Sequence, residues 1–267
     1  ESGKHRPFTR FEHERPNDLW QMDFKGHFAL EEGRCHPLTL LDDHSRYCVG
    51  LAACGDERGE TVRHRLTSIF RRYGLPRNML MDNGSPWGCD VEYPWTSLTV
   101  WLLRLEIDVT HGRPYHPQTQ GKEERFHRTL RIEVLKDRRY RNLSNCQRAF
   151  DDWRDTYNLH RPHEALDLET PVTRYVMSPR TFPETLPAWE YSPGDQVRKV
   201  QGKGEVNFRG REYVVGQAFH GYSVGLRATD EDGVWDLYFC RRRIACVDER
   251  AGTLDRSRRG ASRINAS

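Results

Sequence analysis

The sequence lacks the marks of several broad classes of protein. No apolar run approaches the roughly 18 residues of a membrane-spanning helix, and no secretory signal peptide opens the chain. Its seven cysteines are odd in number and show no C-x-x-C spacing, which argues against a disulfide framework or a zinc knot and favours reduced thiols in the cytosol. The absence of an initiator methionine suggests a fragment or a processed form.

The total charge is also low, at +3 over 267 residues, so the overall balance says little about nucleic acid. Basic residues are nevertheless concentrated in two stretches. Residues 111–143 hold nine Lys and Arg against four acids, and residues 241–263 hold eight Arg against three acids. Either patch alone is explained equally well as a solvated helix face or a basic tail. Together they suit the phosphate backbone of a nucleic acid.

Hydrophobic periodicity predicts an α/β domain followed by a small all-β domain. Apolar alternation and helical spacing place strands at 19–30, 36–41, 47–53, 77–81 and 107–110, and helices at 59–73, 98–105, 121–135 and 144–159. This order is typical of a mixed sheet with an antiparallel edge, flanked by helices. Five or six short strands beyond residue 194 predict a small barrel, similar to an SH3 fold.

Composition shifts set the expected domain boundaries. We expect an arm or linker at 1–16, the α/β domain at 17–176, a proline-rich linker at 177–193, the small barrel at 194–250 and a disordered basic tail at 251–267.

Three acidic positions are the candidates for chemistry. Asp23 lies in a predicted strand, Asp82 follows the apolar run of another, and Glu123-Glu124 opens a predicted helix. Each has an ordinary explanation: a solvent-facing strand acid, a turn-forming Asp-Asn-Gly, and first-turn acids favoured by the helix dipole. Carboxylates that converge from separate elements also hold hard divalent cations, which serve in-line displacement at a phosphodiester.

Several segments resemble the integrase catalytic core of bacterial insertion-sequence transposases, which are relatives of retroviral integrases. The resemblance covers residues 16 to about 250. It rests on PNDLWQMDFKGHF, TLLDDHSRY, YGLPRNMLMDNG, HGRPYHPQTQGKEERFHRTLRIEVL and YNLHRPHEAL. It implies a ribonuclease-H-like sheet with a D,D,E triad, Mg²⁺-dependent nicking of transposon ends with Mn²⁺ as a substitute, and transfer of the freed 3′-hydroxyl into target DNA.

The family motif maps the triad onto Asp23, Asp82 and Glu124, because the family's glutamate lies three residues after the glycine matching Gly121. Helical angles alone leave Glu123 open as the third acid. One departure is visible: 41 residues separate Asp82 from Glu124, somewhat more than the family's usual spacing. The excess falls in SPWGCDVEYPWTS, which we interpret as an inert insertion in preference to a loop that shapes DNA access.

The resemblance further implies DNA contacts from the loop and helix around the third acid. The candidates are His116, Gln118, Gln120, Lys122, Arg125 and Arg128; each alone is also explained as part of a polar surface. The expected partners are double-stranded DNA, as transposon ends and target, and further copies of the chain in a dimer or larger assembly. The expected location is the bacterial cytoplasm at the nucleoid. The helix-turn-helix domains that family members carry upstream are not visible here.

Three alternatives remain. A domesticated DNA-binding protein would keep the fold without catalysis, but an intact triad of acids that repel DNA argues against it. A structure-selective nuclease would use the same fold and release products without joining them. Zinc binding by Cys35 with His36, His44, His111 and His116 matches no usual zinc spacing.

Overall fold

The computed structural model describes residues 13–88, 95–111 and 117–256, with the side chains of 117–120 left out. Contacts divide the chain into two compact units, the first of residues 1–83 and 109–182 and the second of 84–108 and 183–267. Residues 84–108 therefore group with the C-terminal part, whereas the sequence assigned them to the domain at 17–176. The domain boundaries proposed from composition otherwise stay predictions.

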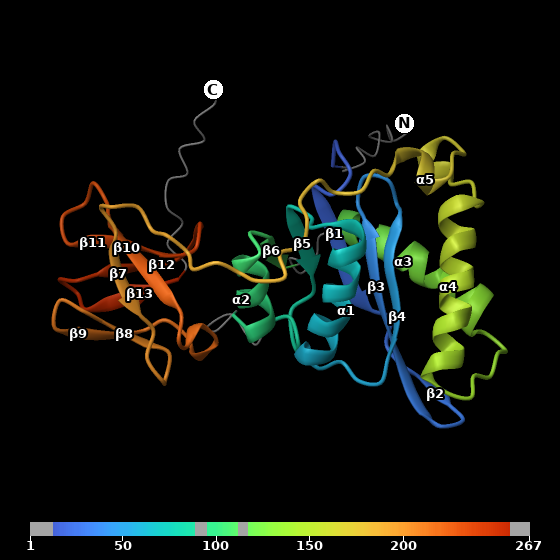
Figure 1. Cartoon of the computed structure of the whole chain (residues 1–267), viewed down its shortest axis with the longest axis horizontal. Helices are drawn as coiled ribbons and strands as arrows, with labels where there is room; N and C mark the ends of the chain where they lie inside the picture. The colour runs from blue at the N-terminus through green and yellow to red at the C-terminus, as the bar shows by residue number, and fades with distance from the viewer. Residues whose placement is uncertain (1–12, 89–94, 112–116, 257–267) are drawn as a thin grey trace, which may run out of the picture. The chain divides into compact units, whose positions relative to one another are not determined.

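A mixed sheet forms the centre of the first unit (Figure 1). Its order is β2-β3-β1-β5-β6, with β4 also paired to β3. The strands are β1 (Leu19–Phe24), β2 (Phe28–Leu30), β3 (Gly33–Asp42), β4 (Cys48–Cys54), β5 (Asn78–Met81) and β6 (Asp108–His111). The strand predicted at 19–30 is broken in two around Gly26, whose positive φ of 82° bends the chain away from the extended conformation.

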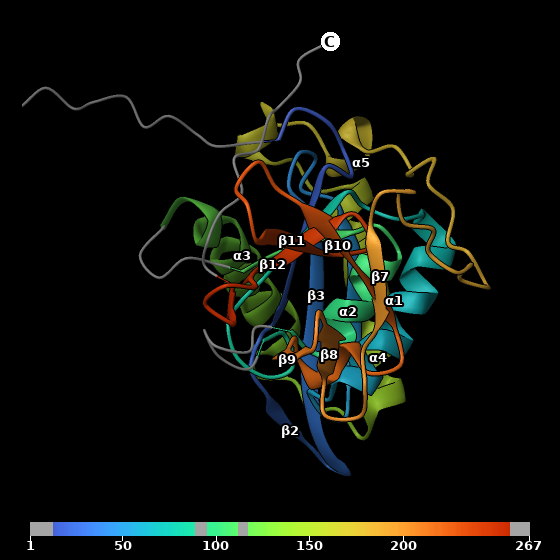
Figure 2. The same ribbon diagram turned by 90° about the vertical axis from the view of Figure 1, so that its left-hand side faces the viewer.

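Helices cover both faces of this sheet, with α1 on one side and α3 on the other (Figure 2). Helix α1 (Gly59–Tyr73) buries Val62, Leu66 and Phe70, which recur every four residues, and ends at Gly74. The opposite face carries α3 (Pro117–Leu130), its π-helical continuation η1 (Arg131–Leu135) and α4 (Leu143–Leu159). Phe126, Leu130 and Phe150 pack there against the sheet. These contacts fix the helix that carries the third acid.

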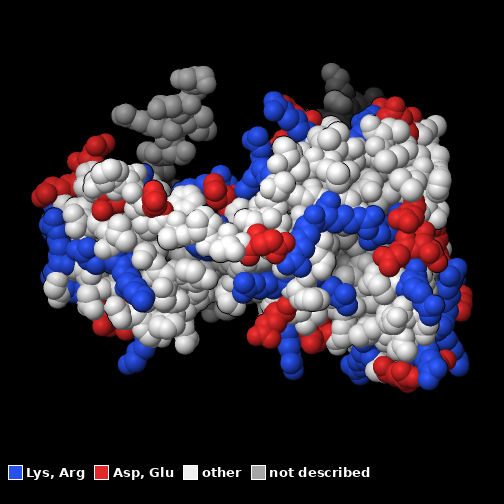
Figure 3. Space-filling model, in the orientation of Figure 1, with Lys and Arg blue, Asp and Glu red and all other residues white. Residues whose placement is uncertain are grey.

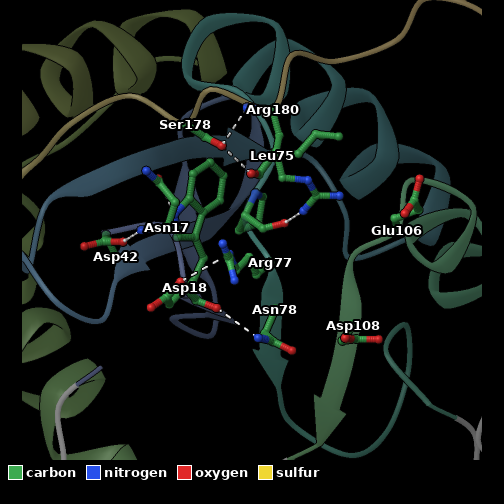
Figure 4. Close-up of polar contacts among 12 residues, drawn as sticks. Asn17, Asp18, Asp42, Leu75, Arg77, Asn78, Glu106, Asp108, Ser178 and Arg180 are labelled. Carbon is green, nitrogen blue, oxygen red and sulfur yellow. Dashed lines mark hydrogen bonds and ion pairs between the residues drawn. The ribbon is translucent and has the colours of Figure 1, made fainter. Parts of the chain in front are cut away.

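The chain after α4 returns along the first unit instead of leaving it at residue 177. It passes through the short helices η2 (Glu164–Leu166) and α5 (Pro171–Arg174). Ser178 Oγ then donates a hydrogen bond to the carbonyl of Leu75 at 2.7 Å, and Arg180 donates to the carbonyl of Pro76 at 2.5 Å (Figure 4). Residues up to 182 belong to this unit, so the first part of the predicted linker is packed structure.

The described part of the second unit is antiparallel β structure with one α-helix and one short 3-10 helix, as predicted for its β part. A five-stranded sheet has the order β13-β12-β11-β10-β7, beside a separate β8-β9 hairpin. Helix α2 (Ser97–Arg104) adds Val100 and Leu103 to its core. The elements are β7 (Gln196–Lys199), β8 (Glu205–Phe208), β9 (Arg211–Val214), η3 (Gln217–Phe219), β10 (Ser223–Ala228), β11 (Val234–Phe239), β12 (Arg242–Asp248) and β13 (Thr253–Asp255).

Strand β13 was not predicted. It pairs with β12 inside the stretch at 251–267 that composition assigned to a disordered tail. The sequence did not predict this strand because its few apolar atoms give no periodic signal. The remainder of that stretch, 257–267, lies outside the described residues. No helix in the described parts of the chain is both long and apolar enough to cross a membrane.

Candidate active site

Asp23 and Asp82 come from adjacent parallel strands of the first unit. The register of β1 and β5 pairs Leu19 with Asn78 and Gln21 with Leu80, and the same offset places Asp23 level with Asp82, directly after β5. The carboxyl ends of parallel strands meet at one edge of a sheet, which is where ligands bind in open α/β folds. Two of the three predicted acids therefore meet at a position typical of an active site.

The pKa values tie a glutamate of α3 to these two aspartates. Burial raises the pKa of Asp23 to about 6, with a further contribution from the charge of Asp82. Burial also raises the pKa of Glu123 to about 8, and the charges of Asp23 and Asp82 both add to that shift. Mutual destabilisation of ionised forms is expected where carboxylates crowd together without a cation. Acids from three elements thus form one electrostatic cluster.

The two glutamates that the sequence left as rivals face different surroundings. Glu123 is half-buried and interacts with both aspartates, whereas Glu124 is exposed. Glu124 lines a hollow in the surface together with Lys25, His127 and Arg128. Lys25 and His127 are themselves neighbours of Asp23, through charge and through a 3.9 Å approach of His127 Nδ1 to Asp23 Oδ2. Glu123 therefore interacts with the two aspartates, and Glu124 lines the hollow next to them. The choice of Glu124 as the third acid stays a prediction.

His127 was not singled out from the sequence. It is buried, and this burial together with the charge of Lys25 lowers its pKa to about 4, so the ring is neutral at physiological pH. Its Nε2 lies 2.9 Å from Thr39 Oγ1, and the Thr39 hydroxyl donates to the carbonyl oxygen of Asp23 at 3.0 Å. The signal that could have found His127 is its spacing, because it lies three residues after Glu124 on the same helix face.

The predicted DNA contacts are distributed unevenly. Arg125 and Arg128 are exposed on α3, while Lys122 forms an ion pair with Asp43 at 2.5 Å and keeps 11% of its side chain exposed. Gln118 and Gln120 belong to α3 itself, which begins at Pro117, and not to a loop before it. His116 lies outside the described residues.

The other cations of this surface were not among the predicted DNA contacts, although Arg131 and Lys136 lie in the basic stretch at 111–143. Lys25, Arg131 and Lys136 line the hollow beside Glu124 together with Arg128. Lys25 could have been found by alternation, since it lies two residues after Asp23 and so on the same face of the chain. Arg131 and Arg128 are three residues apart and share one face of the helix.

No group of three or more His, Cys, Asp or Glu side chains, within the parts of the chain that the structure describes, is gathered closely enough to hold a metal ion. Within the candidate set of the zinc alternative, His36 pairs with Glu57 and the buried Cys35 lies against Cys146, while His116 lies outside the described residues. The carboxylates of Asp23, Asp82 and one of the neighbouring glutamates, Glu123 or Glu124, nevertheless provide the hard oxygen donors that Mg²⁺ and Mn²⁺ prefer. Their chemistry fits a divalent cation that draws them closer together.

The stability of the metal-free protein should fall as the pH rises from 6.5 to 8, above the range in which the lowered pKa of His127 has the opposite effect. Glu123 has a pKa near 8 in the folded protein against 4.5 for an unperturbed glutamate, so folded chains hold a proton that unfolded chains release between these values. The contribution of this proton to the free energy of unfolding is complete below pH 4.5 and is lost as the pH rises towards 8. The free energy of unfolding changes by at most about 1.4 kcal/mol per pH unit for one proton. Chemical denaturation at pH 6.5 and 8 measures it.

Glu123→Gln is the control for this pH dependence, because it removes the titrating group and should flatten the curve between pH 6.5 and 8, above the pKa of about 6 of Asp23. Mg²⁺ binds the deprotonated acids, so its stabilising effect should be larger at pH 8 than at pH 6. A wild-type slope equal to that of Glu123→Gln would contradict the prediction.

Comparison with known proteins agrees with this fold. The integrase core domain matches residues 13–117 in one family model and 105–171 in another, and the IS481 family transposase C-terminal domain matches 195–255. A chain of the simian T-cell lymphotropic virus intasome, solved in complex with PP2A regulatory subunit B56 gamma, aligns with a TM-score of 0.50 at 16% identity, over 87% of this chain and 80% of that one.

Curated relatives come from bacterial insertion elements. An uncharacterized 39.2 kDa protein of insertion element IS476 from Xanthomonas euvesicatoria is 28% identical over 62% of this chain and 46% of its own length. An uncharacterized 31.7 kDa protein of IS407 from Burkholderia multivorans is 25% identical over 58% of this chain and 54% of its own length. The chain spans about half the length of these relatives.

The mixed sheet, its flanking helices and the acids at one sheet edge define a ribonuclease-H-like core of the integrase type. With an IS481-type C-terminal domain matched behind that core, the chain is similar to the integrase-type transposases of bacterial insertion sequences.

Proposed function

We propose that this chain nicks DNA at transposon ends and transfers the freed 3′-hydroxyl into target DNA. The observation that carries this proposal is the level placement of Asp23 and Asp82 at the ends of β1 and β5, with the acidic turn of α3 in electrostatic contact with both. Asp23, Asp82 and Glu124 are the proposed catalytic acids, with Glu123 as the rival of Glu124. The chain would act at the nucleoid in the bacterial cytoplasm.

Asp23, Asp82 and Glu124 would hold divalent cations, with Mg²⁺ first and Mn²⁺ as a substitute, because all three are oxygen donors. Bound there, such cations supply Lewis-acid stabilisation of the phosphoryl oxygens and activation of the attacking hydroxyl. The pKa of Asp23, near 6, leaves it mostly ionised at neutral pH and ready to bind a cation. Thr39 and His127 hold the strand and helix on either side of it.

The DNA backbone would lie along the hollow beside Glu124. Lys25, Arg128, Arg131 and Lys136 line that hollow and provide four cations for phosphates. This surface belongs to the α3 side of the sheet. The face drawn in Figure 3 is different: basic side chains gather there over α1, and acidic ones over α4. Cutting two ends in concert requires a dimer or a larger assembly on DNA.

A strand-transfer assay tests this function. Full-length protein, Mg²⁺ and a pre-cut, labelled duplex carrying the ends of the native element should yield joined products that are longer than the labelled substrate. A nuclease would only shorten the labelled strand. A domesticated DNA-binding protein would change the gel mobility of the duplex without changing the length of its strands. Absence of joining, with tight binding retained, would refute the proposal.

A further inference from the structure

Two polar contacts tie the acidic turn of α3 to the sheet, and the first of them centres on a fully buried carboxylate. Asp43, directly after β3, has a side chain with no solvent exposure. Its Oδ1 accepts from Gln21 Nε2 at 2.6 Å and from Lys122 Nζ at 2.5 Å, and its Oδ2 accepts from the backbone N–H of His13 at 3.0 Å. Gln21 shares one face of β1 with Asp23, so this contact runs beside the acidic cluster.

The second contact lies one turn further along the helix. His127 Nε2 is within 2.9 Å of Thr39 Oγ1 on β3, and Thr39 pairs with Asp23 across the antiparallel ladder. The exposure of the whole His127 residue is 9%. Lys122 and His127 therefore lie before and after Glu123 and Glu124 along the helix. Lys122 contacts Asp43 directly after β3, and His127 contacts Thr39 within β3.

Two fixed points on a helix determine both its position along its axis and its rotation about that axis. One residue corresponds to about 100° of rotation, so a slip of a single residue would exchange Glu123 for Glu124 in front of the aspartates. A buried ion pair contributes little net stability, since desolvation of both charges offsets their attraction. A role in positioning the helix therefore explains the Lys122–Asp43 pair better than a role in stability.

We propose that Lys122–Asp43 and His127–Thr39 form a two-point clamp that fixes the rotation of α3, and with it the positions of both Glu123 and Glu124 relative to Asp23 and Asp82. Lys122 is then a positioning residue and not a contact to DNA. This inference rests on the proposed function, because it concerns the same acids. It assigns a task to Asp43, which the sequence explained only as part of the DDHSR hairpin.

Lys122→Met and Asp43→Asn in the full chain test the clamp. Each should lower kcat for strand transfer by about 100-fold, the effect of misplacing a catalytic group by about 1 Å, and raise the Mg²⁺ concentration needed for half-maximal rate. The KM for DNA and the salt dependence of binding should stay unchanged. The double variant should be no worse than the worse single variant, and Lys122→Arg should restore much of the rate.

The ion pair of Arg174 with Asp167, at 3.2 Å, provides matched controls. Arg174→Met and Asp167→Asn remove the same kinds of charge outside the acidic cluster and should leave kcat and the Mg²⁺ requirement unchanged. If Asp43→Asn does not fold, the split between kcat and KM in Lys122→Met, with its rescue by arginine, decides alone.

A DNA contact would give the opposite pattern. Lys122→Met would then weaken binding and reduce the slope of log K against log salt by about 1, while Asp43→Asn, whose site is closed to DNA, would have no effect; that result overturns the clamp. Hydrogen exchange separates this failure from a failure of the proposed function. Even without strand transfer by the wild type, Lys122→Met should speed amide exchange in residues 121–130, and unchanged exchange refutes the clamp.

Discussion

Asp82→Asn should lower Mg²⁺-dependent strand transfer by about 1000-fold or more while DNA binding survives. The substitution keeps the size of the side chain but removes an anionic metal ligand, and the loss of several kcal/mol of transition-state stabilisation corresponds to a factor of this size. It also removes a charge that raises the pKa of Asp23 and of Glu123. Both pKa values should fall, which makes those acids easier to ionise without restoring the missing ligand.

Single-turnover strand transfer with pre-cut ends measures this effect, and a filter or gel-shift titration measures binding. DNA affinity should be equal or slightly higher, because one negative charge near the phosphates is gone. Asp151→Asn on the outer part of α4, half-exposed at 45%, is the matched control and should keep wild-type activity. Strand transfer by Asp82→Asn within about tenfold of wild type would show that these acids do not hold the catalytic metal.

Elements with strong local signals were predicted correctly from the sequence. The helix expected at 59–73 is α1, since Val62, Leu66 and Phe70 keep helical spacing up to Gly74. Weak local signals failed: α3 begins at Pro117 and not near 121, because Gln118, Thr119 and Gln120 add no apolar residue to the pattern. Likewise, the packing of residues 176–182 against α1 and β5 depends on long-range hydrogen bonds that no local pattern encodes.

The candidate site also has residues that the sequence predicted and residues that it did not. Strand alternation and a following turn made Asp23 and Asp82 candidates that only the family motifs singled out, and their parallel register brings them level. The partners of the acids were beyond prediction because they come from distant segments: Lys122 reaches Asp43 across 79 positions, and His127 reaches Thr39 across 88. Lys122 was therefore assigned to DNA, although in the fold its side chain is paired with the buried carboxylate of Asp43.

Glu124→Gln should abolish strand transfer, with a loss of about 100-fold or more, whereas Glu123→Gln should stay within about threefold of wild type. The two substitutions are isosteric, neighbouring and equal in charge, so each is the control for the other. Glu123 has a pKa near 8 and is mostly protonated at neutral pH, and glutamine reproduces a neutral acid closely. Glu124 is exposed beside Lys25 and Arg128, where an arriving phosphate and its cations would meet it.

Parallel measurements at pH 7 with Mg²⁺ and with Mn²⁺ test which of the two glutamates is a metal ligand. Mn²⁺ tolerates a changed ligand set better than Mg²⁺, which demands near-ideal octahedral oxygen geometry, so partial rescue by Mn²⁺ should appear only in the variant that lost a ligand. An inactive Glu123→Gln beside an active Glu124→Gln would make Glu123 the third ligand and show that the motif position is one residue off. The contact of Glu123 with both aspartates in the metal-free fold would then be the catalytic arrangement itself.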